Sequence, residues 1–197
     1  MEKLFIFIKH NLKGLWNIIE FLNGITLAFL YRKKIIALGE KYASYTGTNR
    51  DFQFRLLTIN DLDMLSGFLQ SLGKDYIKYF NPHGFDRKAL TRVLTTKNYL
   101  PFGYFHNDKL IGYFMLRLFA NRRAFTGRVV DPEYNGRGIG KDMARKMYGM
   151  ANELNWGVFG TASEKNLASL KTHNYEVVKK LPNGYLLIKY NTKSTNW

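Results

Sequence analysis

The sequence of 197 residues contains no cysteine. This absence excludes disulfides, thiolate metal ligands and a cysteine nucleophile, and it favours a reducing, cytoplasmic setting. Acidic residues are also scarce, because 15 Asp and Glu accompany 30 Lys and Arg and leave a net charge of +15. Such a surface attracts anionic partners, among them phosphorylated cofactors, nucleic acid and anionic bilayers. The charge by itself does not choose among these partners.

Long hydrophobic runs are missing from the N-terminal region, where the longest uncharged run, 21–31, is well short of the roughly 18 residues of a membrane span. A helical stripe is present instead, with apolar residues spaced by three and four: Leu4, Ile8, Leu12, Leu15, Ile19 and Leu22. It predicts an amphipathic helix, interrupted near Asn23-Gly24, within a helical appendage of residues 1–49. We expect residues 1–45 to pack on the main domain, to form a homodimer, or to contact a membrane surface peripherally.

Residues 50–197 are expected to form a second unit of mixed α/β (α+β) class, with a mostly antiparallel central sheet flanked by helices. Alternation and turn residues predict a strand at 52–57, a hairpin of 99–106 and 109–119 around Asn107-Asp108, a strand at 123–130, a strand at 156–161 and a closing hairpin of 177–181 and 185–190. Helical spacing predicts helices at 62–72, 86–94, 139–154 and 164–173.

The stretch V-V-D-P-E-Y-N-G-R-G-I-G-K at 129–141 joins a predicted strand to a predicted helix through three glycines. The first amides of a helix lack intrahelical acceptors, the helix dipole adds positive potential, and glycines let a phosphate approach closely. A P-loop is excluded because Asn135 replaces its first glycine and Asp142 follows the lysine. A dinucleotide fingerprint is excluded because the spacing is G-x-G-x-G and the preceding strands are predicted to be antiparallel.

The stretch resembles the signature Q/R-x-x-G-x-G/A of the GNAT superfamily of acyl-coenzyme A-dependent N-acyltransferases. Residues 135–140, N-G-R-G-I-G, match both glycine positions, with Asn135 in place of the usual Gln or Arg. The predicted order of elements over 52–190 also agrees with that fold. A second resemblance lies in E-K-N-L-A-S-L-K-T-H, where Asn166 and Ser169 match a family pattern and His173 replaces its tyrosine.

The resemblance implies acetyl-coenzyme A as cosubstrate, bound between the fourth and fifth strands with its pyrophosphate on the glycine turn. Carried over by position, the coenzyme-binding residues are Val129, Val130, Asn135, Gly136, Arg137, Gly138, Ile139, Gly140, Lys141, Asn166 and Ser169. The implied reaction is direct attack of a neutral amine on the thioester, which requires no metal. His173 is the candidate proton donor to the leaving thiolate, and Glu133 and Asp131 are candidate bases.

The implied activity is N-acetylation of a small-molecule primary amine, with an amino sugar, nucleotide-linked or lipid-linked, as the favoured acceptor. The loop region containing Tyr76, Tyr79, Phe80 and His83 would form the acceptor half of the site. One alternative is acetylation of a protein or peptide amine. Another is a non-catalytic protein of the same fold, associated with membrane or nucleic acid, although no nucleic-acid partner is expected for the enzyme. The expected location is cytoplasmic, with peripheral membrane contact through residues 1–45.

Overall fold

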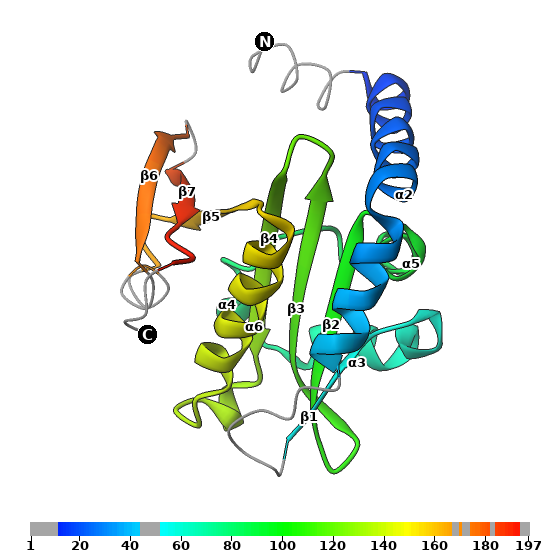
Figure 1. Ribbon diagram of the computed structural model, residues 1–197. Coiled ribbons are helices and arrows are strands. Elements are labelled where there is room, and N and C mark those ends of the chain that lie inside the picture. The colour runs from blue at the N-terminus through cyan, green and yellow to red at the C-terminus, as the bar shows by residue number, and fades with distance from the viewer. Residues whose placement is uncertain (1–11, 44–51, 167–169, 171–173, 182–183, 194–197) are drawn as a thin grey trace.

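A computed structural model describes residues 12–43, 52–166, 170, 174–181 and 184–193 (Figure 1). Its centre is a seven-stranded sheet in the order β1-β2-β3-β4-β5-β7-β6. The strands are β1 (Gln53–Leu56), β2 (Tyr99–His106), β3 (Lys109–Phe119), β4 (Arg123–Val130), β5 (Gly157–Ser163), β6 (Tyr175–Lys180) and β7 (Tyr185–Tyr190). All neighbouring strands run antiparallel except β4 and β5. The expected mixed, mostly antiparallel sheet is therefore confirmed.

The parallel pair β4 and β5 is joined at one end only. Arg123–Phe125 pairs with Gly157–Phe159, and the register goes no further along either strand. β4 remains paired with β3 on its other side as far as Val130, while β5 pairs with β7 from Phe159 onward. The two strands therefore diverge in the middle of the sheet, and the edge of β4 that faces β5 is left without a neighbouring strand.

Helices cover both faces of the sheet (Figure 1). One face carries α2 (Lys13–Ala43) and α6 (Ile139–Leu154), and the other carries α3 (Leu62–Ser71), α4 (Lys74–Ile77) and α5 (Arg87–Thr95). Short 3-10 turns η1 (Ile59–Asp61) and η2 (Pro132–Tyr134) complete the set. Apolar side chains on the two faces of the sheet form two hydrophobic cores. One lies beneath α2 and α6 and includes Phe102 and Phe114. The other lies beneath α3 and α5 and includes Leu65 and Tyr113.

The turn between β2 and β3 forms as its residues predict. Asn107 and Asp108 have φ angles of 48° and 62°, the left-handed conformation that a two-residue hairpin turn requires and that Asn and Asp tolerate. Other predicted boundaries shift by one or two residues. The predicted helix at 164–173 lies largely outside the described residues, which include only its start and Leu170.

The expected interruption of the N-terminal helix at Asn23-Gly24 is wrong, because α2 runs without a break from Lys13 to Ala43. The Asn23 side chain bonds to β3 and not to its own helix. Its Nδ2 donates to the Leu118 carbonyl at 3.0 Å, and its Oδ1 accepts from the Ala120 amide at 2.9 Å. An asparagine that would often end a helix is here a tertiary contact. No helix within the described ranges is long and apolar enough to cross a membrane.

The inward face of α2 is set by a buried ion cluster and an apolar row. Glu20 is 7% exposed and pairs with Arg92 of α5 and Arg117 of β3. Further along, Leu27, Ile35 and Leu38 enter the core beneath α6. The predicted stripe is not this face: its members Leu12, Leu15 and Leu22 are 45%, 43% and 55% exposed, and Ile19 is half-buried. The other two members, Leu4 and Ile8, lie outside the described residues.

Candidate functional site

The glycine turn leads from β4 through η2 into α6. Gly136 and Gly138 have φ angles of 78° and 80°, a region that favours glycine, and nothing lies within 4 Å of where a Cβ would stand on either. Gly138 is the N-cap of α6, and the Gly138 carbonyl accepts from the Asp142 amide at 3.0 Å. The amides between them have no acceptor within the helix. The turn therefore presents backbone donors beside open space.

A cleft of about 430 Å³ opens at this turn. Its lining comprises Arg128, Val130, Tyr134, Asn135, Gly136, Gly138, Ile139, Gly140, Lys141 and Ala144. Most of the predicted coenzyme-binding residues are thus brought together. Arg137 does not line it, and its guanidinium lies 4.8 Å from the centre of the Tyr134 ring.

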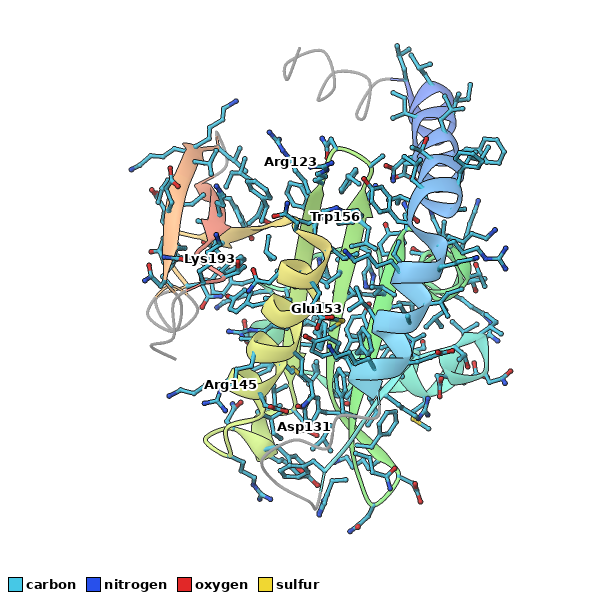
Figure 2. All side chains as sticks on the ribbon, in the orientation of Figure 1. Arg123, Asp131, Arg145, Glu153, Trp156 and Lys193 are labelled. Atoms are coloured by element: carbon cyan, nitrogen blue, oxygen red, sulfur yellow. The ribbon has the colours of Figure 1, made fainter. Side chains whose placement is uncertain are left out.

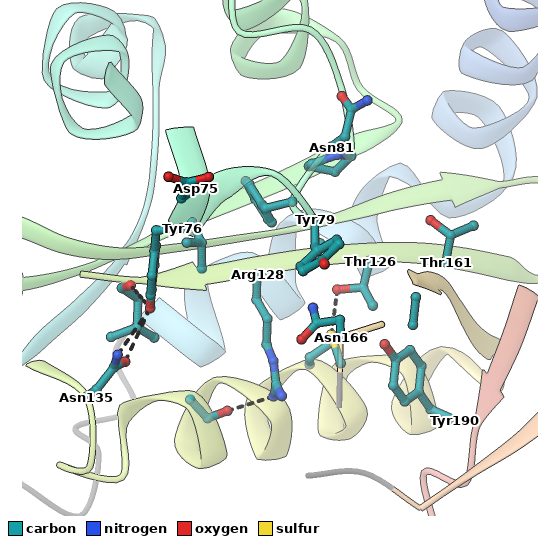
Figure 3. Close-up of a pocket in the computed structure, with 18 residues that line it drawn as sticks. Asp75, Tyr76, Tyr79, Asn81, Thr126, Arg128, Asn135, Thr161, Asn166 and Tyr190 are labelled. Atoms are coloured by element: carbon teal, nitrogen blue, oxygen red, sulfur yellow. Dashed lines mark hydrogen bonds between the residues drawn. The ribbon is translucent and has the colours of Figure 1, made fainter. Parts of the chain in front are cut away.

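A second cleft, of about 480 Å³, occupies the gap between β4 and β5 (Figure 3). It shares Arg128, Val130, Asn135 and Gly140 with the first, so the two openings adjoin. The remaining lining residues are Asp75, Tyr76, Tyr79, Phe80, Asn81, Pro82, Thr126, Gly127, Val129, Met147, Thr161, Ala162, Asn166 and Tyr190. The α4 region therefore faces the divergent strands across this cleft.

Asn135, the departure from the usual Gln or Arg, bonds across the cleft. Its Nδ2 donates to the Tyr76 hydroxyl at 3.3 Å, and that hydroxyl donates to the Val130 carbonyl at 2.8 Å (Figure 3). The three groups tie α4, the end of β4 and the glycine turn together. A short amide suits this geometry because its partner is a tyrosine from another element. The sequence did not single out Tyr76 for this role.

Arg128 brings a cation to the point where the two clefts meet. Its Nη1 donates to the Gly140 carbonyl in the first turn of α6 at 2.7 Å (Figure 3). Burial lowers the pKa of this guanidinium, and Tyr190 and Tyr148 oppose that effect. An arginine remains protonated under such conditions. Positive charge from a strand thus adds to the positive end of the helix.

Tyr190 is a site residue that the sequence analysis missed. It comes from the last strand, β7, yet it lines the same cleft as Thr161 and Asn166. Burial raises the pKa of its phenol, against a smaller opposite effect of Arg128, so the hydroxyl keeps its proton at neutral pH. A tyrosine in a terminal strand is indistinguishable from a core residue until the fold brings it to the gap.

The two predicted bases lie elsewhere. Asp131 is 8% exposed, accepts from the Glu133 amide at 3.0 Å and pairs with Lys109 at 3.3 Å. Glu133 faces the same ammonium at 3.6 Å. Lys109 belongs to the start of β3, and neither carboxylate lines either cleft; Figure 2 shows Asp131 at the end of the sheet where β4 enters the turn. Asp131 therefore caps the turn after β4, and the exposed Lys109 pairs with both carboxylates.

His83 lies between α4 and α5 and does not line the clefts. Its Nδ1 lies 2.7 Å from the Gly84 carbonyl, which can only accept, so Nδ1 carries the proton. Its Nε2 then accepts from the Tyr113 hydroxyl at 2.8 Å. Burial lowers the pKa of the imidazole and raises that of the Tyr113 phenol well above its usual value. Both nitrogens thus have partners away from the cleft.

The remaining predicted residues fall on the segment after β5. Asn166 lines the larger cleft, and its backbone N–H donates to the Ser163 carbonyl at 2.9 Å. Ser169 and His173 lie outside the described residues. Their roles as coenzyme contact and proton donor stay predictions.

The model of the acetyltransferase (GNAT) family matches residues 65–174, more than half of the chain. The chain belongs to this family. The match runs from within α3 to beyond β5, and so includes the lining of the smaller cleft and that of the larger one except Tyr190. A comparison with curated protein sequences found no match.

Solved structures resemble the chain in fold at low sequence identity. The GNAT domain of S. lividans PAT is 13% identical, with a TM-score of 0.61 over 70% of this chain and 88% of that one. The PaiA N-acetyltransferase of Thermoplasma acidophilum, in complex with coenzyme A, is 16% identical, with a TM-score of 0.58 over 71% and 98%. An aminoglycoside acetyltransferase in complex with coenzyme A and kanamycin is 16% identical, with a TM-score of 0.55 over 72% and 95%. These matches support the GNAT fold.

Proposed function

We propose that this GNAT protein is an acetyl-coenzyme A-dependent N-acetyltransferase that acts on a primary amine by direct transfer. One observation carries the proposal: the donor-rich start of α6 and the open edge of β4 meet in adjoining clefts that share Arg128 and Val130. Family membership and the coenzyme A bound to two structural neighbours support it.

The residues present fit the two ends of the coenzyme. A pyrophosphate suits the turn, because Gly136 and Gly138 leave open space, the following amides are free of helical acceptors, and Lys141 adds charge. A pantetheine arm suits the β4 edge from Thr126 to Val130, since an extended chain of amides can pair with a strand that has no neighbour on that side.

Acetyl-coenzyme A would supply the thioester carbonyl, and this chain must then orient the amine and provide a proton for the departing sulfur. Tyr190 is our candidate for the proton, because its neutral hydroxyl faces the gap between β4 and β5. Asp75, exposed on the α4 side of the same cleft, is our candidate for attracting the ammonium form of the acceptor. His173 remains an alternative donor.

The acceptor half favours an amino sugar, free or linked to a nucleotide or lipid. Tyr76 and Tyr79 offer aromatic faces and Asn81 an amide to a ring that carries hydroxyl groups, with Asp75 for its amine (Figure 3). Sugar sites commonly combine aromatic surface with a few placed polar groups. The net charge of +15 argues against a polycationic acceptor and suits an anionic, nucleotide-linked one.

Two measurements test the proposal in order. Calorimetry should detect coenzyme A binding to the full chain, and absence of binding at millimolar concentration would refute it. A thiol-release assay with acetyl-coenzyme A should then find turnover on amino sugars or their nucleotide conjugates. Binding without thiol release on any sugar, peptide or antibiotic amine would support the non-catalytic alternative.

Replacing Tyr190 with Phe tests the proton donor. We expect kcat to fall by roughly 100-fold, within the range for loss of a general acid, with coenzyme A affinity little changed. Tyr185→Phe, on the same strand but outside both clefts, should have no such effect. Unchanged kcat in Tyr190→Phe together with a collapse in His173→Phe would assign the proton to His173.

A further inference from the structure

The outward face of α2 is covered with large apolar side chains. Seven of them are about half exposed or more: Ile18 55%, Phe21 68%, Leu22 55%, Ile25 50%, Phe29 87%, Leu30 59% and Ile36 49%. Among the described elements none covers this side of the helix (Figure 1). A monomeric protein rarely leaves so continuous an apolar surface in water, which makes this face a candidate contact surface.

The charges of α2 are separated from this face. Between Leu12 and Tyr31 the acidic residue is Glu20, which is buried against Arg92 and Arg117. The apolar face therefore carries no negative charge along its first half. Three consecutive exposed basic residues, 32–34, interrupt it before Ile36.

An apolar groove of about 420 Å³ runs beside the same helix. Leu27, Ile35 and Ile36 of α2 line one side, and Leu94 and Leu100 are among the residues across from them. Its lining also includes two basic side chains, Arg32 and Lys97, and one acidic side chain, Glu40. The groove extends the apolar surface towards α5, with more positive than negative charge beside it.

The charge and the apolar surface of α2 distinguish between two partners for its outward face, a second copy of the chain and an anionic bilayer. A second copy of the chain would bring two molecules of charge +15 together and place like-charged basic residues near the contact, which opposes association. An anionic bilayer takes up apolar side chains at the level of its headgroups and attracts lysine and arginine beside them. We propose that α2 docks in the plane of an anionic phospholipid bilayer through its outward face. The inference does not depend on the proposed transferase activity.

The test uses the full chain with vesicles of mixed phosphatidylserine and phosphatidylcholine, sedimented and assayed for bound protein. We expect binding that weakens as salt is added and is weak on phosphatidylcholine alone. The double variant Ile25→Gln/Phe29→Gln should lose at least about tenfold in partitioning, because two exposed anchors are removed. The matched control Ile59→Gln/Met64→Gln, with 44% and 41% exposure near α3, should bind as the unchanged chain does.

Two results would overturn the proposal. If the single variant Phe29→Gln and the double variant both keep their circular dichroism and still bind the vesicles normally, this face is not the docking surface. If the unchanged chain ignores vesicles but sediments as a dimer that Ile25→Gln/Phe29→Gln converts to a monomer, the partner is a second copy.

Discussion

Gly138 and Gly184 share a backbone conformation but differ in surroundings. Their φ angles are 80° and 74°, and nothing lies within 4 Å of a Cβ on either, but only Gly138 lines a cleft. Gly138→Glu and Gly184→Glu should therefore lose similar stability, about 1–2 kcal/mol from the left-handed conformation. Only Gly138→Glu should abolish coenzyme A binding in calorimetry, because it puts a carboxylate at the pyrophosphate. Equal binding by both variants would show that the turn is a connection only.

The lowered pKa of His83 predicts that the stability of the protein depends on pH. Because burial lowers its pKa in the folded protein, the folded state holds the imidazole neutral while the unfolded chain takes up a proton below about pH 6.5. The contribution of His83 to the free energy of unfolding is therefore complete above that pH. It is lost as the pH falls towards the lower pKa of His83 in the folded protein. Urea unfolding between about pH 8 and pH 5 should show this loss, reduced in His83→Gln.

NMR titration of the His83 ring provides the check on that prediction. Its midpoint should lie below the usual histidine value, because Nε2 is occupied by the Tyr113 hydroxyl and the ring is half-buried. A midpoint at or above the usual value would contradict a neutral imidazole in the folded protein.

Residues differ in how far their roles could be predicted from the sequence. The glycine turn could be predicted because its function rests on neighbours in the chain and on the backbone freedom of glycine. Tyr76 and Tyr190 could not, since their roles depend on Val130 and on the gap after Phe125, which long-range strand pairing creates. Asp131 was misleading, because proximity in sequence to β4 did not reveal Lys109 as its partner.

At the scale of elements, α4 is tied to the glycine turn through one hydroxyl. Tyr76→Phe removes the bonds to Asn135 and Val130 and should weaken coenzyme A binding by about 2–10-fold, the range for one lost hydrogen bond. Tyr79→Phe is the control, since Tyr79 lines the same cleft but makes no such link among the described residues. If calorimetry finds the same coenzyme A affinity for both variants, the link between α4 and the glycine turn does not contribute to coenzyme binding.

The elements themselves were largely predictable, and the failure at α2 has a physical reason. Alternation and turn residues set β2, β3 and β4 within a residue or two, because those signals are local. The break expected at Asn23 followed the same local logic, but the amide bonds to β3 satisfy Asn23 without ending the helix. The stripe at Leu12, Leu15 and Leu22 was real, but it faces solvent, since Glu20 and Leu27 turn the other side towards the sheet.

For the whole molecule, the question is whether the helical appendage predicted at residues 1–49 unfolds together with residues 50–197 or separately from them. Two glutamates take part in ion pairs between α2 and other elements. Glu20 of α2 is buried between Arg92 and Arg117. Glu153 of α6 pairs with Lys41 of α2 at 2.8 Å, and its side chain is 37% exposed. Removing the anion of a buried cluster leaves its arginines without a counter-charge, while exposed pairs contribute little.

We therefore expect Glu20→Gln to lower the free energy of unfolding by about 2 kcal/mol or more, below the full cost of a wholly buried pair because Arg92 is 44% exposed. Glu153→Gln should change it by less than about 1 kcal/mol. If α2 belongs to the folding unit, both variants will unfold in a single calorimetric transition, since Leu27, Ile35 and Leu38 share a core with α6. A second transition that moves alone in Glu20→Gln would instead make residues 1–49 an independent appendage.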